Sequence, residues 1–207
     1  GKHFSAGADV NWFKELAVAD SDYKLQASTW TTTAMRSLHE FPKPTVALVQ
    51  NACMGGGTGY AAACDIVVAS EDARFSISEV RLGITPAPIL VQCLMAMGLR
   101  QVRRYAITGE IFDVHAALRM GLVHEVCGIG ELEQAAAPIV DALLLSGPQA
   151  ITDTKRMTLR IADALMSDEL VQELALTSAA GRDTEEGVEG FTAFLEKRKP
   201  SWYVGGE

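Results

Sequence analysis

The chain has 207 residues, 48% of them hydrophobic, and a formal net charge of −8 at neutral pH. This size and apolar content predict a soluble globular protein, built as one large domain or as a domain with an appendage. The negative charge argues against nucleic acid or an anionic membrane surface as a partner, and no apolar run reaches membrane-spanning length. We therefore expect no nucleic acid and no membrane among the partners.

The four cysteines are Cys53, Cys64, Cys93 and Cys127, and they form no CxxC pair. Most of them lie in apolar surroundings, which predicts reduced thiols in a cytoplasmic protein. The cysteines and histidines lack the spacing of metal ligands, so we expect no metal site.

Small residues dominate the N-terminal segment Phe4–Asp9, and the sequence begins as if at the end of a strand and a turn. We therefore expect that N-terminal strands precede Gly1. Asp9 is predicted to cap the short amphipathic helix that follows. A polar break at residues 19–22 and a second helix at 25–39 come next.

The stretch from Pro44 to Gly83 organises the rest of the chain. Apolar strands are predicted at 45–49 and 66–69, with the three glycines Gly55–Gly57 and a small-residue helix between them. Glycines let a backbone approach a ligand closely, and the free N–H groups at a helix start carry positive partial charge. The sequence therefore predicts a binding place for a phosphate, a carboxylate or a developing oxyanion at this turn.

Polar and apolar residues alternate along Arg74–Glu79, which predicts a strand. On such a strand Phe75, Ile77 and Glu79 share a face, so the carboxylate would point inward with the two apolar side chains. Burial would raise the pKa of Glu79 and suit this group to carry a proton near neutral pH. The alternative is a strand-end glutamate in solvent or in an ion pair with Arg81.

The chain after Gly83 is mainly helical. The proline-rich loop at 85–88 is predicted either to form a pocket wall beside Glu79 or to act as a connector. Gly109 and Gly121 are predicted to end helices. The expected elements are helices at 89–97, 100–107, 112–120 and 131–145, a strand at 122–126, and a kink or break at Pro138.

A helical C-terminal region at residues 146–207 is predicted to follow a first domain at 1–145, because Ser-Gly-Pro at 146–148 interrupts the chain. One of its helices carries an apolar stripe. This stripe either packs on its own chain or forms an oligomer interface, and it consists of Val188, Phe191, Phe194 and Leu195.

The sequence does not support dinucleotide binding or catalysis by a serine nucleophile. Gly57–Ala62 matches the GxGxxA pattern of dinucleotide-binding turns, but the space between Gly59 and Asp65 is too short for the crossover helix of that motif. The chain has no GxSxG nucleophile elbow, and its four histidines lie on separate elements.

Four segments resemble signatures of the crotonase superfamily, the enoyl-CoA hydratases and isomerases. They are Phe4–Asp9, Pro44–Asp65, Phe75–Gly83 and Phe194–Lys199, and the resemblance extends over essentially the whole chain. It implies an α/β fold, a crotonase-type spiral of ββα turns with a helical C-terminal trimerisation region. It also implies an acyl-CoA thioester as substrate, no tightly bound cofactor, and a homotrimer or a dimer of trimers.

The resemblance further implies roles for single residues. The backbone N–H groups of Ala6 and Gly56 would form an oxyanion hole for the thioester, and Glu79 would be the catalytic acid/base. Substrate contacts are implied for Ala6, Gly7, Ala8, Asp9, Gly56 and Lys197, the last of them with a CoA phosphate.

One position departs from the family pattern. The first of the two glutamates of a hydratase falls on Gly59, which leaves Glu79 as the single carboxylate, with Thr58 and Tyr60 as weak substitutes. Three functions stay open: hydration of a 2-enoyl-CoA, double-bond isomerisation of an enoyl-CoA through Glu79 alone, and acyl-CoA binding with little activity. The segment Ser78–Ile89 resembles bacterial hydratases of branched glutaconyl-CoA substrates and favours hydration, with 3-methylglutaconyl-CoA of leucine breakdown as one substrate.

Overall fold

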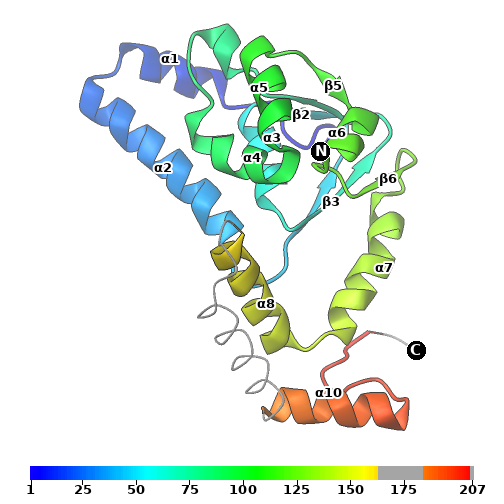
Figure 1. Ribbon diagram of the computed structural model, residues 1–207. Helices are drawn as coiled ribbons and strands as arrows, with labels where there is room; N and C mark the ends of the chain where they lie inside the picture. The colour runs from blue at the N-terminus through cyan, green and yellow to red at the C-terminus, as the bar shows by residue number, and fades with distance from the viewer. Residues whose placement is uncertain (163–183, 206–207) are drawn as a thin grey trace. The chain divides into compact units, whose positions relative to one another are not determined.

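The computed structural model describes residues 1–162 and 184–205 and divides the chain into two units (Figure 1). The first unit comprises residues 1–41 and 45–136, and the second comprises residues 42–44 and the described part of 137–207. Within the described ranges, no helix has both the length and the apolar character needed to cross a membrane.

One sheet of the first unit is parallel throughout. β1 (Val46–Val49) pairs with β3 (Ile66–Ser70), and β6 (Glu125–Cys127) pairs with the other edge of β3. The register places Val46 opposite Ile66. Most residues of β3 are buried, which explains why this strand is a continuous apolar run rather than an alternating one.

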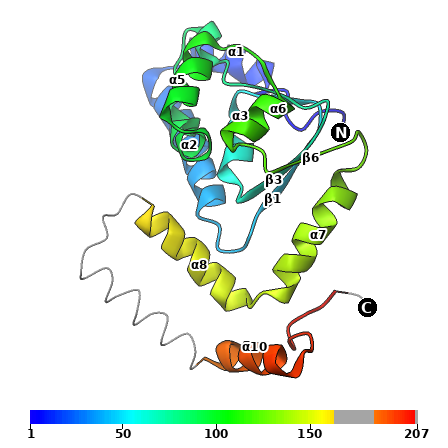
Figure 2. The same cartoon turned by 45° about the vertical axis from the view of Figure 1, so that its right-hand side comes forward.

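The second sheet lies closer to the glycine-rich turn. β2 (Ala52–Met54) pairs in parallel with β4 (Arg74–Ser76), and β5 (Phe112–Asp113) runs antiparallel to β4. β2 is not expected from the sequence, because three residues carry no readable alternation. β1 and β3 thus belong to one sheet, and the strands that follow each of them belong to the other. This arrangement confirms the expected spiral of strand–strand–helix turns. Figure 2 labels β1, β3 and β6, the strands of the parallel sheet.

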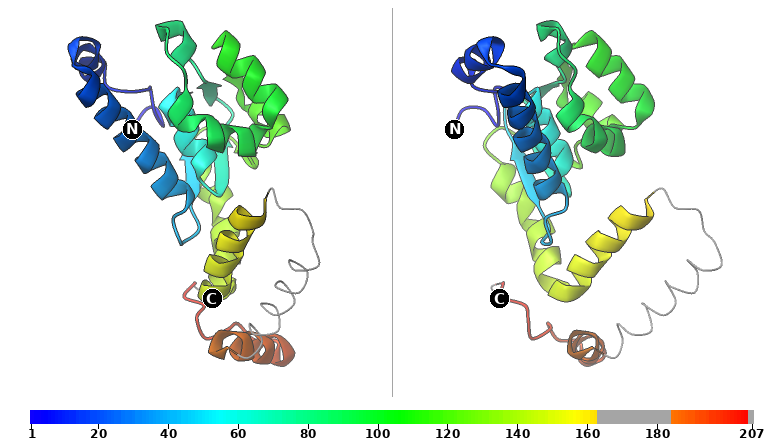
Figure 3. Two further views of the ribbon diagram at one scale, coloured as in Figure 1. Left: turned by 60° about the vertical axis from the view of Figure 1, so that its left-hand side comes forward. Right: turned by 90° about the vertical axis from the view of Figure 1, so that its left-hand side faces the viewer.

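Six helices accompany the sheets of the first unit, and both α2 and α4 pack on α3 (Figure 3). The predicted caps are confirmed. The side chain of Asp9 accepts hydrogen bonds from backbone N–H groups of the first turn of α1, and left-handed residues Gly109 and Gly121 end α5 and α6. The helices are α1 (Val10–Val18), α2 (Ser21–His39), α3 (Gly56–Ala63), α4 (Leu90–Met97), α5 (Leu99–Thr108) and α6 (Val114–Met120).

Three predicted boundaries are wrong, each for a local reason. The break at 19–22 is shorter, because Asp20 caps α2 by accepting a hydrogen bond from the Tyr23 N–H, so α2 already begins at residue 21. Residue 112 belongs to β5, where Phe112 stacks on Phe75. The strand expected at 122–126 begins only at 125, because the N–H of Leu122 still bonds to a carbonyl of α6.

The second unit consists of helices in its described part. α7 (Leu132–Leu145) runs through Pro138, so of the predicted kink or break the break is wrong, and the kink stays a prediction. α8 (Pro148–Ile161) is capped by the carboxylate of Glu186, which accepts hydrogen bonds from the first backbone N–H groups of that helix. Glu186 itself belongs to α10 (Glu185–Glu196).

Part of the predicted C-terminal region lies outside the described residues. This applies to 163–183 and to three side chains of the apolar stripe, those of Phe191, Phe194 and Leu195. The fourth member, Val188, is exposed.

The side chain of Thr58 joins α3 to β2 and β4 of the second sheet. It is fully buried, and its hydroxyl lies 2.7 Å from the carbonyl oxygen of Cys53 on β2 and 2.8 Å from that of Ser76 on β4. Buried carbonyl groups are costly to leave without a donor. This hydroxyl therefore holds the start of α3 in place above the second sheet.

Replacing Thr58 by valine, which has the same shape but no hydroxyl, should lower the free energy of unfolding by about 1–3 kcal/mol. Urea denaturation of the purified variant measures this change. The matched control is Thr29→Val, since the Thr29 hydroxyl bonds to a helix carbonyl at an exposed position. Equal effects of the two substitutions would contradict the structural role of Thr58.

Candidate active site

Residues 4 and 5 run alongside β2 as an additional parallel segment. The N–H of Phe4 donates to the carbonyl of Gln50 at 3.0 Å, and the N–H of Ser5 donates to that of Ala52 at 2.9 Å. The carbonyl of Ser5 in turn accepts a hydrogen bond from the Met54 N–H at 2.9 Å. This pairing carries the chain to the end of β2, where α3 begins.

The side chain of Ser5 lies against Gly57, in the first turn of α3. A Cβ atom on Gly57 would lie 2.5 Å from Cβ of Ser5 and 2.7 Å from its Oγ. No side chain fits at such distances, so the absence of one at Gly57 is what allows the approach. The chain that follows Ser5, beginning with Ala6, therefore passes the N-terminus of α3.

Gly55 makes the turn between β2 and α3. Its φ of 54° and ψ of −122° belong to a region that side chains strongly disfavour. Its N–H donates to the carbonyl of Ser76 on β4 at 2.9 Å, and a Cβ atom on it would lie 3.2 Å from Oε1 of Glu79. The carboxyl group of Glu79 thus lies against the backbone of this turn, one residue before α3 begins.

The backbone N–H groups of Ala6 and Gly56 are available to a ligand. Among the described residues, neither of them donates to an acceptor. Gly56 is the first residue of the eight-residue α3, where free N–H groups and the helix dipole give positive partial charge. An oxygen atom that carries or develops negative charge would be stabilised at this position.

Glu79 does not lie on a strand, so the predicted alternation is wrong. β4 ends before it, and Glu79 begins the short 3-10 helix η1 (Glu79–Leu82). The chain turns at Ser78, whose carbonyl accepts a hydrogen bond from the Arg81 N–H at 3.0 Å. The inward orientation is found nevertheless, because Phe75 and Ile77 are fully buried and Oε2 of Glu79 is buried with them.

The surroundings of Glu79 favour its protonated form. Its Oε2 has no hydrogen-bond partner among the described residues. Burial raises the pKa of Glu79 above its ordinary value, and hydrogen bonds from the backbone of Glu79 and Ser78 partly offset the rise. The alternative ion pair is not found, since the side chain of Arg81 lies against Gly109. A carboxyl group in this state is suited to take up and release a proton.

The thiols near this carboxyl group are uncharged at neutral pH. Burial, with a smaller contribution from the charge of Glu79, raises the pKa of Cys93 on α4 to about 12. Burial also raises the pKa of Cys53 on β2 to about 12. All four cysteines are free, and the described residues contain no group of three or more His, Cys, Asp or Glu that could hold a metal ion.

Gly59 lies one turn after Gly55 on α3 and faces Ile89, which ends the 3-10 helix η2 (Ala87–Ile89). A Cβ atom on Gly59 would lie 2.2 Å from Cγ2 of Ile89, 2.6 Å from its Cβ and 3.5 Å from Sδ of Met35. The branched Ile89 side chain therefore occupies the space that any side chain at position 59 would need. Nothing in the local sequence around Gly59 indicates this contact, because Ile89 is far away along the chain.

The remaining sequence-predicted site residues lie in different places. Gly7, Ala8 and Asp9 follow Ala6 at the surface, and the Asp9 carboxylate caps α1. Lys197 is exposed directly after α10, in the second unit. The structure thus brings Ser5 and Glu79 to either side of the α3 N-terminus, and Lys197 belongs to the other unit.

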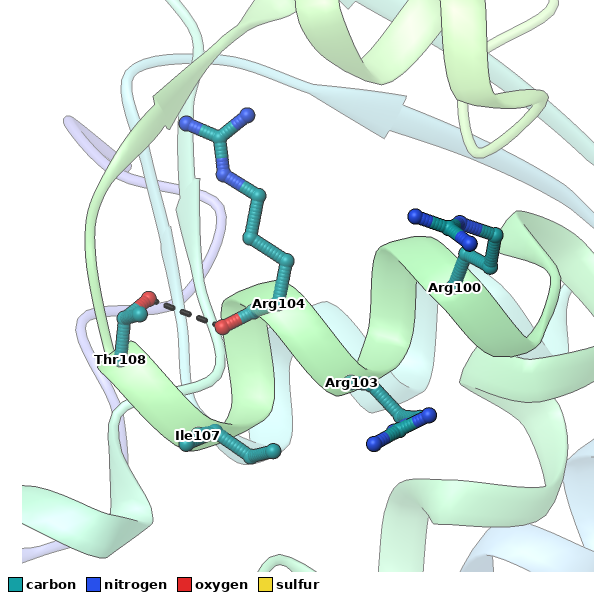
Figure 4. A pocket seen from close by; sticks show the side chains of 5 residues that line it. All are labelled: Arg100, Arg103, Arg104, Ile107 and Thr108. Atoms are coloured by element: carbon teal, nitrogen blue, oxygen red, sulfur yellow. Dashed lines mark hydrogen bonds between the residues drawn. The ribbon is translucent and has the colours of Figure 1, made fainter.

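A shallow pocket on α5 is a feature that the sequence predictions missed (Figure 4). Ile107 and Thr108 line it together with three arginines, and the residues predicted for the active site do not. Arg104 forms an ion pair with Glu110 at 2.7 Å. The i, i+3, i+4 spacing of the arginines was the available signal, and the other two are Arg100 and Arg103.

Residues 1–204 match the family model described as "Enoyl-CoA hydratase/isomerase". A short-chain-enoyl-CoA hydratase of Clostridium acetobutylicum is 33% identical over 202 residues, which are 96% of this chain and 75% of that protein. A mitochondrial Delta(3,5)-Delta(2,4)-dienoyl-CoA isomerase of Dictyostelium discoideum is 30% identical over 97% of this chain and 71% of its own length.

Solved structures give the same result. An enoyl-CoA hydratase from Shewanella pealeana superimposes with a TM-score of 0.93 at 40% sequence identity, covering 98% of this chain and 76% of that one. The family match extends over nearly the whole sequence, and the fold agrees with that of the family's solved members. The chain therefore belongs to the enoyl-CoA hydratase/isomerase family, the crotonase superfamily.

Proposed function

We propose that this protein hydrates a 2-enoyl-CoA thioester, with Glu79 as its single acid/base. The observation that carries the proposal is the position of the Glu79 carboxyl group. It lies against Gly55, directly before the N-terminus of α3, and its Oε2 has no partner in the described part of the chain. An acid held beside a set of free backbone donors can move a proton next to a polarised carbonyl group.

The backbone N–H groups of Ala6 and Gly56 would bind the thioester oxygen. This oxygen becomes negatively charged when the double bond is attacked, and fixed donors stabilise that charge more than they stabilise the neutral carbonyl. One such donor contributes on the order of 3 kcal/mol to the transition state. Because both groups belong to the backbone, their positions depend on the fold rather than on side-chain rotamers.

One carboxyl group is enough for the proton transfers of the hydration. Water forms a bond from its oxygen to C3 while one of its protons passes to the Glu79 carboxylate, and the electron pair of the double bond moves to the thioester oxygen. The enolate then returns this pair to C2, which takes the proton from Glu79. The raised pKa of Glu79 makes its carboxylate a stronger acceptor for the proton of water than an ordinary carboxylate would be.

The CoA part of the substrate would pass along the segment from Ala6 to Asp9, and Lys197 would bind a CoA phosphate. Lys197 is exposed and lies in the second unit, so this contact can come from the same subunit or from a neighbouring one. We include in the proposal a homotrimer or a dimer of trimers. The resemblance of Ser78–Ile89 to hydratases of branched glutaconyl-CoA makes 3-methylglutaconyl-CoA the first substrate to test.

Double-bond isomerisation is the second candidate, and the contact at Gly59 favours it. Ile89 fills the space where a side chain at position 59 would lie, so Glu79 has no carboxylate beside it at that position to share the handling of water. Moving one proton between two carbons needs one carboxyl group only. One of the relatives is named as an isomerase.

Incubating the purified protein with crotonyl-CoA, with 3-methylglutaconyl-CoA and with a 3-enoyl-CoA in oxygen-labelled water separates these functions. Hydration gives a 3-hydroxyacyl-CoA that contains the label. Rearrangement of a 3-enoyl-CoA without uptake of the label would replace hydration by isomerisation. Tight binding of the CoA esters without turnover of any of them would leave an acyl-CoA-binding protein with little activity.

Replacing Glu79 by glutamine should lower kcat at least about 100-fold, because glutamine cannot take up or release the proton. The KM for the CoA ester should change little, since shape and size are kept. Glu110→Gln is the matched control, because Glu110 lies at the surface in its ion pair with Arg104. Turnover by Glu79→Gln within about tenfold of the wild type would remove Glu79 from the mechanism.

The same substitution should raise the free energy of unfolding at neutral pH. Because the pKa of Glu79 is raised in the folded state, its stabilising contribution is full below its ordinary value of 4.5 and is lost as the pH rises through the raised folded value. Glutamine does not ionise, so the advantage of Glu79→Gln should grow from acidic to neutral pH in urea denaturation.

Glu110→Gln should act in the opposite direction. Its hydrogen bond and attraction to Arg104 lower the pKa of Glu110, so its contribution is present above the ordinary value and is lost in acid. If both variants lost stability alike at neutral pH, the burial of the Glu79 carboxyl group with an unpartnered Oε2 among the described residues would be contradicted.

A further inference from the structure

Gly55, directly before α3, and Gly59, within it, are each covered by a side chain from a later part of the chain. At Gly55 an added Cβ would lie 3.2 Å from Oε1 of Glu79, and at Gly59 it would lie 2.2 Å from Cγ2 of Ile89. Glu79 therefore lies at the turn into α3, and Ile89 lies against the first half of the helix.

The start of α4 presents the residues that cover this face. Ile89 directly precedes α4 and is 2% exposed, and Cys93 follows it by four residues and is fully buried. The charge of Glu79 acts on the Cys93 thiol, so this thiol lies near the carboxyl group. The contact of Ile89 with Gly59 thus fixes how closely α4 approaches α3, and the next turn of α4 borders Glu79.

The charges of the titratable groups around Glu79 do not explain why its protonated form is favoured. Cys93 of α4 and Cys53 of β2 are both protonated at neutral pH, since burial raises the pKa of each to about 12. On η1 itself, the guanidinium stem of Arg81 lies against Gly109. Burial is therefore the main cause of the raised pKa of Glu79.

We propose that Ile89 is a positioning residue for Glu79: by lying against Gly59 it fixes α4 against α3 and keeps Oε2 of the Glu79 carboxyl group buried and away from hydrogen-bond donors. The inference rests on the proposed function, in which Glu79 carries the proton. Ile89 touches no reacting atom in this scheme. It acts by setting the distance between α3 and α4. A smaller side chain would no longer set this distance and would let water enter between the two helices.

The test compares Ile89→Ala, Ile89→Val and Leu122→Ala. Leu122 is a fully buried core residue, so its truncation controls for the general loss of packing. Ile89→Ala should lower kcat about tenfold or more with little change in KM, and should move the Glu79 limb of the pH–rate profile toward lower pH, because water would enter beside the carboxyl group. Ile89→Val keeps the branch against Gly59 and should restore most of both properties.

Leu122→Ala should lose thermal stability without moving the pH–rate profile. If Ile89→Ala kept the wild-type profile, or if Leu122→Ala moved it equally, the positioning role of Ile89 would be overturned. The loss of activity alone would not distinguish the two variants, so the profile decides the outcome.

A readout without turnover separates this inference from the proposed function. The titration of the Glu79 carboxyl carbon, assigned by its disappearance in Glu79→Gln, can be followed by NMR in the wild type and in each variant. A lower titration midpoint in Ile89→Ala supports the inference even if no enoyl-CoA is converted. An unchanged midpoint overturns it even if the wild type is an active hydratase.

Discussion

Close approach of separate backbone segments at the N-terminus of α3 is the constraint on which the rest of the site depends. Three positions in and before this helix have no side chain, and each is covered by a residue from another part of the chain. The pairs are Gly57 with Ser5, Gly55 with Glu79, and Gly59 with Ile89. Ser5 leads to the free N–H of Ala6, Glu79 carries the acid, and Ile89 directly precedes α4. The three glycines therefore allow segments that are distant in sequence to meet at one place.

This arrangement has a cost in stability. A carboxyl oxygen is buried without a partner at Glu79, and Gly55 adopts a backbone conformation that few residues tolerate. The buried hydroxyl of Thr58, which lies within hydrogen-bond distance of both strands of the second sheet, offsets part of that cost close to where it arises. The supporting Thr58 therefore lies in the first turn of α3, which begins directly after Gly55.

The sequence predicted what depends on local signals. Asp9, Gly109 and Gly121 mark helix ends because capping is decided by one residue and its immediate neighbours. The inward direction of Glu79 was predicted from a strand that ends before it, since β4 stops at Ser76 and the chain turns into a 3-10 helix. The contact of Ile89 with Gly59 could not be predicted at all, because it requires knowing how α4 packs on α3.

Hydratases and isomerases occur together among relatives about 30% identical to this chain, and the geometry gives a physical reason. Both reactions need backbone donors for a thioester oxygen and an acid within reach of the neighbouring carbons. These parts come from glycine-rich backbone and from one short 3-10 helix, neither of which depends on the acyl group. Hydration also needs a water molecule at C3, whereas isomerisation does not. The same backbone donors and the same acid can therefore serve either reaction.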